Sequence, residues 1–183
     1  ALFATMPQRR IAPNVISYNA AVSACEKGGQ WQRALIIFES MNGAKVTPDC
    51  ISLYAILDTV FDQPSGLDIF RRAFGQTTGF TPKSCDDIHI DLHELSAGAA
   101  LTTVYWWLSA FAMRRLPDAS ATHRLHIITG WGKSRRFGDK ESAVKASVHE
   151  LLNQLELPLA NQSNQGRLVV RASRARVRSA LGI

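Results

Sequence analysis

The stretch VISYNAAVSACEKGGQWQRALIIFESMNGAKVTPD, residues 15–49, decides the fold of the first half of this 183-residue chain. It holds two runs of apolar residues at helical spacing, separated by Gly28 and Gly29, which break the chain. Gly43 and Pro48 mark the end of the second run. The pattern predicts a helical hairpin. Its apolar positions are Tyr18, Ala21, Val22 and Cys25 in the first helix, and Trp31, Ala34, Leu35, Phe38 and Met41 in the second.

Weaker copies of this unit lie on both sides of it, at an offset of 35 residues. The matching positions are Phe3 and Phe38, Met6 and Met41, Ile11 and Val46, Pro13 and Pro48, Ile16 and Ile51, Ser17 and Ser52, and Ala20 and Ala55. Because one helical pair cannot bury its apolar face alone, the units are expected to stack. We assign residues 1–83 to this repeat region: a half repeat, the full repeat, and a degenerate capping repeat that loses the register after Gln63.

With this length and pattern, residues 15–49 resemble a pentatricopeptide repeat, a two-helix unit of RNA-binding superhelices. In that family the fifth and the last residue of each repeat select one RNA base. The resemblance implies that Asn19 and Asp49 do so here and favour uracil, by hydrogen bonds to the Watson–Crick edge of an unstacked base. Tyr54 occupies the fifth position of the next unit, which is expected to cap the stack. The alternative is a helical solenoid that binds protein.

Charge is unevenly distributed along the chain. Residues 1–122 hold 10 Lys and Arg against 11 Asp and Glu, a net charge of −1, whereas residues 123–183 hold 11 against 4, a net charge of +7. Such asymmetry is expected of a segment that binds nucleic acid. A solubilising basic surface is the alternative.

The periodicity changes after Asp86. Ile88, Ile90 and Leu92 alternate with polar residues, which predicts a strand that buries these three side chains. Ser96 is expected to cap the helix that follows. The later predicted elements are a helix over residues 97–111, a strand at 125–129, a helix at 144–155, and a hairpin of strands 158–163 and 167–172. This βαβαββ order predicts a two-layer α/β sandwich over residues 86–183, so that the fold class is α + α/β.

Asp91 and His93 lie two positions apart in IHIDLHELS, residues 88–96. At about 3.3 Å per residue, they would lie about 7 Å apart on one strand face and could hold a substrate phosphate between them. The carboxylate could also orient the imidazole. A group that titrates near neutral pH suits a general base acting on a ribose 2′-hydroxyl or a water. A polar decoration of an ordinary strand is the alternative.

A second candidate lies in TGWGKSRR, residues 129–136, between a predicted strand and a predicted helix. Gly130 and Gly132 allow close backbone approach, so that their N–H groups can face a phosphate. The side chains expected to bind nucleic acid are Trp131, by base stacking, and Lys133, Arg135 and Arg136, by charge. A tight turn with a solvated basic rim is the alternative. A nucleotide-binding P-loop is excluded because Ile127 stands where that motif requires glycine.

Together, IDLH at residues 90–93 and TGWG at residues 129–132 resemble the markers of a Small MutS-related (Smr) domain. The resemblance covers residues 86–183 and, with the repeats upstream, is similar to the plant- and alga-type fusion of the two modules. It implies an endonuclease whose catalytic residues are Asp91 and His93. Ile90 replaces a leucine of the first motif, and Thr129 stands where the bacterial-type second motif has histidine.

Further basic residues gather near the C-terminus. Arg171 is a candidate contact to the nucleic-acid backbone, followed by Arg174, Arg176 and Arg178. A solvated helix face is the alternative. We assign no metal-binding residue, because no full set of ligands is evident, although Mg²⁺ held by Asp91 would suit nuclease chemistry.

These features predict an RNA-binding protein in which the repeats select single-stranded RNA and the second domain, an endoribonuclease, cleaves it. Two other functions stay open: a non-catalytic RNA-binding module in organellar RNA processing or translation, and a nuclease that nicks DNA. A 2′-deoxy substrate separates cleavage through the 2′-hydroxyl from attack by water.

The remaining composition bears on partners and compartment. Three cysteines without a C-x-x-C pair argue against a disulfide framework and a zinc site. No stretch approaches the roughly 20 apolar residues that cross a bilayer, so no membrane partner is expected. We expect a monomer. Because the chain opens ALFATM, we expect a fragment whose targeting segment lies upstream. The resemblance implies an organelle, chloroplast or mitochondrion, with the cytoplasm as the alternative.

Overall fold

The computed structural model describes residues 2–6, 10–73, 88–114, 120–130, 142–160 and 166–183. The chain divides into two compact units, Ala1–Thr81 and Pro82–Ile183. Each unit has a buried apolar core of its own. No helix in the described ranges is long and apolar enough to cross a membrane.

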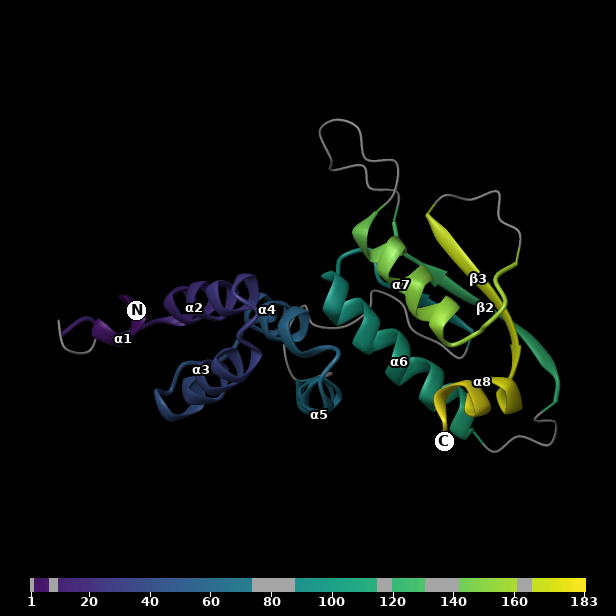
Figure 1. Cartoon of the computed structure of the whole chain (residues 1–183), viewed down its shortest axis with the longest axis horizontal. Helices are drawn as coiled ribbons and strands as arrows, with labels where there is room; N and C mark the ends of the chain where they lie inside the picture. The colour runs from purple at the N-terminus through teal and green to yellow at the C-terminus, as the bar shows by residue number, and fades with distance from the viewer. Residues whose placement is uncertain (1, 7–9, 74–87, 115–119, 131–141, 161–165) are drawn as a thin grey trace. The chain divides into compact units, whose positions relative to one another are not determined.

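The first unit is helical (Figure 1). Its helices are α1 (Leu2–Thr5), α2 (Val15–Lys27), α3 (Trp31–Gly43), α4 (Cys50–Val60) and α5 (Pro64–Ala73). Helix α2 packs against both α3 and α4, and α4 packs against α5. The helical hairpin predicted over residues 15–49 therefore corresponds to α2 and α3, and the residues assigned to the degenerate repeat form α4 and α5.

The first helices of the two helix pairs, α2 and α4, begin with the same type of cap. Asn14 caps α2 by accepting from the Ser17 N–H (3.0 Å), and Asp49 caps α4 by accepting from the Ser52 N–H (2.8 Å). In both helices the serine hydroxyl accepts from the backbone of the capping residue, which closes a capping box. The break between α2 and α3 falls at the two predicted glycines, where Gly29 has φ +63°.

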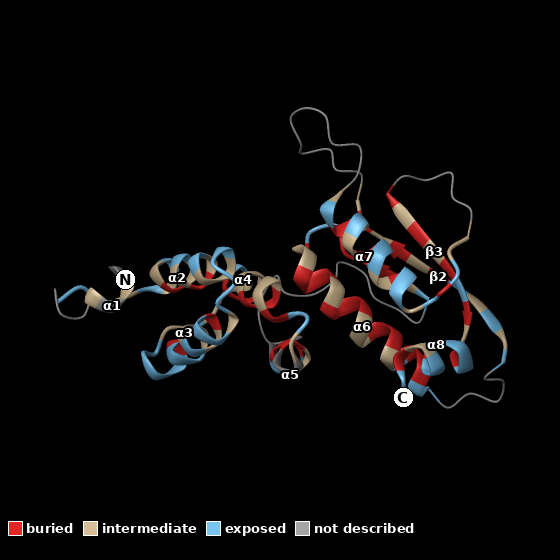
Figure 2. Ribbon diagram, in the orientation of Figure 1, coloured by how far each residue is buried: buried red, intermediate tan, exposed pale blue. Residues whose placement is uncertain are grey.

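The core of the first unit is formed by apolar side chains from α2 to α5 (Figure 2). Its buried residues are Tyr18, Val22, Ala34, Met41, Leu53, Ile56, Leu57, Val60, Ile69 and Phe70. Helix α4 contributes four of these ten residues, more than any other helix, since it packs against α2, α3 and α5. The register loss after Gln63 therefore does not stop α4 and α5 from packing together.

The second unit combines helices with a small sheet (Figure 1). Its elements are β1 (His89–Asp91), α6 (Ala97–Met113), β2 (Thr122–Ile128), α7 (Ala143–Gln154), β3 (Arg167–Ser173) and α8 (Arg174–Leu181). The strand order is β1-β2-β3, with β1 and β2 parallel and β2 and β3 antiparallel. Ser96 caps α6 as predicted, by accepting from the Ala99 N–H (3.4 Å).

One face of this sheet is buried. Ile90, Leu125 and Ile127 are fully buried, as is Val170 on β3. Phe111 of α6 lies on this side, with its ring 5.5 Å from that of His123 on β2. Buried residues run the length of α6 (Figure 2). Sheet and helices thus form two layers, as the βα alternation predicts.

Several predicted elements of this unit were wrong in extent. The strand predicted at 158–163 is a single bridge from Leu159 to Val170 within the described residues. Two backbone bonds flank it, from the Ala160 N–H to the Val169 carbonyl (2.8 Å) and from the Arg171 N–H to the Pro158 carbonyl (3.1 Å). Strand β2 begins three residues earlier than predicted, because its polar start pairs with β3 through the backbone.

Two further differences come from packing. Ile88 was expected to be buried, but it precedes β1 and is 37% exposed. Helix α8 was not predicted as an element. Ser173 caps it by accepting from the Arg176 N–H (3.2 Å), and Gly182 ends it with φ +68°. Arg174, expected in a basic run that contacts nucleic acid or forms a solvated helix face, is instead buried and lies over the Phe111 ring.

Candidate functional site

Asn19 and Asp49, the predicted base-selecting pair, lie side by side in the first unit. The Asn19 Nδ2 amide donates to Asp49 Oδ1 (3.2 Å), across 30 residues of sequence. Asn19 projects from the second turn of α2, and Asp49 stands at the start of α4. The contact between these two helices therefore brings the fifth and the last residue of the repeat together.

Ser52 joins this pair, and sequence reasoning missed it as a site residue. Its hydroxyl lies 2.6 Å from Asn19 Oδ1 and 2.9 Å from Asp49 Oδ1, so its one proton serves one of these oxygens at a time. The Ser52 side chain is buried. The sequence feature that could have pointed to Ser52 is its match with Ser17 at the 35-residue offset, because both repeats have serine at this position.

The hydrogen bonds around Asp49 favour its ionised form. Burial by itself raises the pKa of the Asp49 carboxyl. The hydrogen bonds from the Ser52 backbone and hydroxyl and from Asn19 lower this pKa by more than burial raises it, so the net shift is downward. These bonds all end on Oδ1. Within the described residues, Oδ2 receives none, which leaves a carboxylate oxygen to accept from a ligand beside the second Asn19 N–H.

Asp91 and His93 lie closer than the 7 Å expected of neighbours on one strand face. His93 Nδ1 is 2.6 Å from Asp91 Oδ1, and the His93 N–H donates to the same oxygen (3.1 Å). The distance is short because β1 ends at Asp91, so that His93 lies in the following turn and folds back onto the carboxylate. The Leu92 N–H between them donates to the Ile128 carbonyl (2.8 Å), which ties this turn to the end of β2.

The pair is accessible from solvent on one side. The Asp91 side chain is 16% exposed and the His93 side chain 33%. Nδ1 is the ring nitrogen engaged by the carboxylate, and Glu94 Oε1 lies 3.7 Å from the other nitrogen, Nε2, on a side chain 60% exposed. A carboxylate on one imidazole nitrogen and a reacting group on the other is the arrangement of a positioned general base.

Gly130 links the glycine turn to this pair. It has φ +79°, and a Cβ built on it would lie 3.0 Å from His93 Cβ. Thr129 before it is buried, and its N–H donates to the Gly166 carbonyl (2.9 Å). The two motifs, 37 residues apart between His93 and Gly130, are thus in contact. The predicted contacts Trp131, Gly132, Lys133, Arg135 and Arg136 lie outside the described residues.

The close approach of Gly130 to His93 predicts the effect of a single methyl group. In Gly130→Ala, the side chain meets His93 and the backbone holds a left-handed conformation that alanine disfavours. We expect His93 to shift and any cleavage rate to fall by about tenfold to a hundredfold. Single-turnover cleavage kinetics measure this. Gly182→Ala is the matched control: it shares the positive φ but has no atom within 4 Å of the added Cβ. Equal rates in the two variants would contradict the contact.

His89 and His126 form a second feature that sequence reasoning did not assign as a pair. Their rings stack with centroids 4.8 Å apart and an interplanar angle of 14°. Burial lowers the pKa of His126, and electrostatic interactions with His89, Arg167 and Arg124 lower it further. In the part of the chain that is described, His126 Nδ1 is buried without a hydrogen-bond partner. The register of β1 with β2, which places His89 beside His126, was the missing information.

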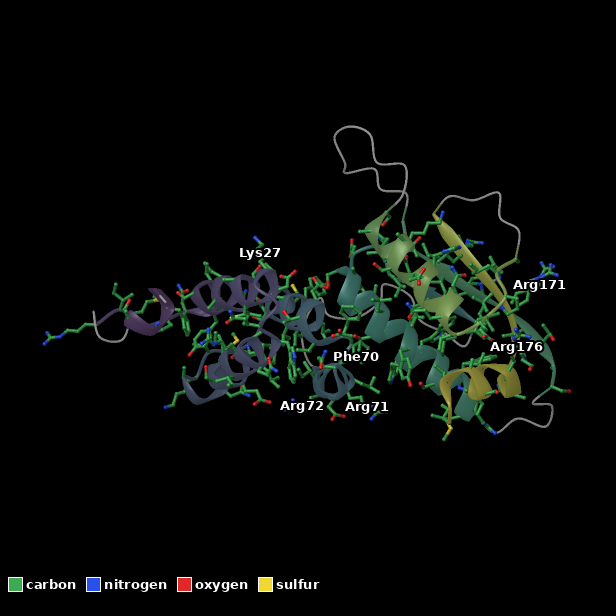
Figure 3. The ribbon with its side chains drawn as sticks, in the orientation of Figure 1. Lys27, Phe70, Arg71, Arg72, Arg171 and Arg176 are labelled. Atoms are coloured by element: carbon green, nitrogen blue, oxygen red, sulfur yellow. The ribbon has the colours of Figure 1, made fainter. Side chains whose placement is uncertain are left out.

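Metal ligands and the remaining basic residues complete the candidate site. Among the described residues, no group of three or more His, Cys, Asp or Glu side chains is placed to hold a metal ion. Arg171 is exposed on β3, and its side chain extends away from the sheet (Figure 3). Arg176 and Arg178 instead donate to the carbonyls of Glu156 and Ala112 (both 2.8 Å), so these two arginines secure α8.

Comparison with known proteins bears on the first unit. Residues 1–63 match the family model described as pentatricopeptide repeat domain. Two *Arabidopsis thaliana* proteins named as pentatricopeptide repeat-containing proteins, At1g18900 and At1g74750, are 36% identical over 81 residues and 32% identical over 74 residues. These alignments cover 44% and 40% of this chain but 9% and 8% of the relatives. No solved structure matches the chain significantly. The helical hairpins and their recurrent caps agree with this match, so residues 1–63 are similar to pentatricopeptide repeat sequence.

Proposed function

We propose that the first unit binds single-stranded RNA and that the second unit cleaves it. The observation that carries the first half is the Asn19–Asp49–Ser52 cluster within the pentatricopeptide repeats. It presents an amide N–H beside a carboxylate oxygen. An unstacked uracil has an N–H flanked by carbonyl oxygens. The N–H can donate to the carboxylate, and a carbonyl oxygen can accept from the amide.

The cluster makes base selection testable without loss of the fold. Asp49→Asn keeps a capping side chain for α4, because Asn14 caps α2 in the equivalent position. It replaces an obligate acceptor by an amide. We expect the preference of this chain for uridine over the other bases to fall by about 2- to 10-fold, the worth of one hydrogen bond.

Equilibrium binding to four short RNAs that differ in one base measures this preference. Asp68→Asn is the control, since it makes the same exchange on a side chain of α5 that is 73% exposed, and it should leave the preference unchanged. Circular dichroism should show the same helix content in all three proteins. An Asp49→Asn protein that keeps the full preference would refute base reading by this pair.

The proposal for the second unit rests on the contact between Asp91, His93 and Gly130. In the 2′-hydroxyl route, His93 Nε2 takes the proton from the ribose hydroxyl while the 2′-oxygen bonds to phosphorus. The bond from phosphorus to the 5′-oxygen of the next nucleotide breaks, and that oxygen gains a proton as it leaves. Asp91 holds the ring through Nδ1 and stabilises the charge it acquires.

The Gly130 backbone is proposed to help hold the phosphate. Its positive φ is the conformation in which successive N–H groups form an anion-binding concavity. The likeness of residues 90–93 and 129–132 to the Small MutS-related motifs supports this assignment. Attack by water, or on DNA, would use the same His93 base but would not need the 2′-hydroxyl. A substrate with one 2′-deoxyribose at the cleaved position separates the two routes.

A further inference from the structure

Apart from His123, the charged and aromatic polar side chains of the three strands lie on the face opposite the core. Pairing places them in three rows across the sheet, together with Ile128 and Val169. The rows are Asp91, Ile128 and Arg167; His89, His126 and Val169; and Arg124 and Arg171. Successive rows lie about 7 Å apart. The first row ends at the carboxylate that holds His93.

Burial differs sharply between the two faces of the sheet. On the core face, Leu125 and Ile127 are fully buried, whereas Arg124 between His123 and Leu125 is exposed. Arg171 is likewise exposed between the buried Val170 and Ala172. The side chains of Arg124, Arg167 and Arg171 with the His89–His126 stack are called the basic sheet face below.

The charges of the basic sheet face are unbalanced. The three strands contain three arginines, all on this face, and one acid, Asp91, which is engaged by His93. Arg124 and Arg171 stand directly opposite each other in the antiparallel pair. Like charges at such positions destabilise a sheet. Neither guanidinium has an ion pair or a side-chain hydrogen bond among the described residues.

His126, in the middle row of the basic sheet face, lies near the positive charges of Arg124 and Arg167. Burial lowers the pKa of His126 in the middle row, and the charges of Arg167 and Arg124, in the rows on either side, lower it further. The stacked rings of His89 and His126 place two aromatic side chains in this row, and His126 Nδ1 is buried without a hydrogen-bond partner in the described ranges. Cationic rims around aromatic rings are the composition of single-strand nucleic-acid surfaces.

We propose that the basic sheet face binds the phosphate backbone of single-stranded RNA and leads it to His93. The inference rests on the proposed function and adds a binding surface to it. A polyanion relieves the repulsion between Arg124 and Arg171, and the row that contains Asp91 places the end of this track at the candidate base. Phosphate contacts fix the position of a strand without reading its sequence.

The test removes the positive charges of Arg124 and Arg171. In the double variant Arg124→Gln with Arg171→Gln, affinity for single-stranded RNA should fall by the same factor for all base sequences. Each phosphate contact on a single strand contributes about 0.7 to the slope of log affinity against log salt, so the slope should fall by about 1.4. Between 50 and 200 mM salt, the parent should therefore lose about sevenfold more affinity than the variant.

Two controls isolate the face. Arg176→Gln with Arg178→Gln makes the same charge change on α8, where glutamine keeps an amide for the two carbonyls, and should retain the parental slope. Arg124→Lys with Arg171→Lys keeps the charge and should retain it as well. The glutamine variant of the face should unfold at the same temperature as the parent or higher, because it relieves a like-charge pair.

The outcomes separate this proposal from base reading by the repeats. If the Asp49→Asn protein loses base preference while the Arg124/Arg171 variant binds with the slope of the α8 control, the basic sheet face is refuted alone. If slope and affinity fall but no base preference exists, the face stands and base reading fails. A parent that binds no RNA overturns both.

Discussion

His93→Ala should cleave single-stranded RNA about 10²- to 10⁴-fold more slowly than the parent, with unchanged RNA affinity. This range is the usual contribution of a positioned general base. The expected loss is large because His93 is the proposed base and Asp91 holds its ring in place through Nδ1 at 2.6 Å. The measurement is single-turnover cleavage of a uridine-containing RNA, with and without Mg²⁺, beside equilibrium binding of a non-cleavable analogue.

Asp91→Asn should show a smaller loss than His93→Ala, since the amide can still contact the ring but cannot stabilise its positive charge. His149→Ala is the control, because that histidine is exposed on α7 and bonds only to Asn153 among the described residues (3.2 Å). A substrate with a single 2′-deoxyribose should resist the parent if the 2′-hydroxyl is the nucleophile. If the parent binds RNA and does not cut it in either buffer, the nuclease proposal is refuted and the Asp91–His93 pair is at most part of a binding surface.

Gly66→Ala should destabilise the first unit by about 3 kcal/mol, the upper end of what overpacking usually costs. Gly66 lies in the first turn of α5 and is buried against the end of α4. A Cβ there would overlap the Val60 carbonyl oxygen and lie 3.2 Å from Phe61 Cα. These atoms belong to the backbone and cannot rotate away, so α5 must move. That movement would expose Ile69 and Phe70, the buried residues of α5 itself.

Urea unfolding followed by circular dichroism measures this loss, and hydrogen exchange of the α4 and α5 amides locates it. Gly43→Ala is the matched control, because nothing lies within 4 Å of the added Cβ at the end of α3. That variant should be as stable as the parent or more so, since alanine favours a helix by about 1 kcal/mol over glycine. Equal stability of the two variants would show that α4 and α5 do not pack as described.

The repeats were the most predictable part of the chain. Tyr18, Val22, Ala34 and Met41 were placed on apolar faces by their spacing, and all four are buried. Helical periodicity and capping residues act within one or two turns, so a local stretch of sequence contains them. The boundaries at Gly28 and Gly29 were predictable for the same reason, since the chain must break where glycine replaces the apolar pattern.

The second unit was less predictable because strand boundaries depend on partners. The polar residues 122–124 carry no strand pattern, yet they pair with β3. Arg174 belongs to the basic run that was expected to contact nucleic acid or to form a solvated helix face. Its guanidinium is instead buried over Phe111 and lies 3.2 Å from His123 Nε2. The packing of α8 against α6 decides this burial, which no local pattern contains.

The sequence by itself determined the helical repeats, their caps, and the residue types of both candidate sites. Tertiary structure decided which of these residues meet. It brought Asn19 to Asp49 across 30 residues, placed Gly130 against His93, and lined up Arg124 with Arg171. The physical reason is range: periodicity and capping act between neighbours along the chain, whereas helix packing and strand register join residues that only the folded chain brings within bonding distance.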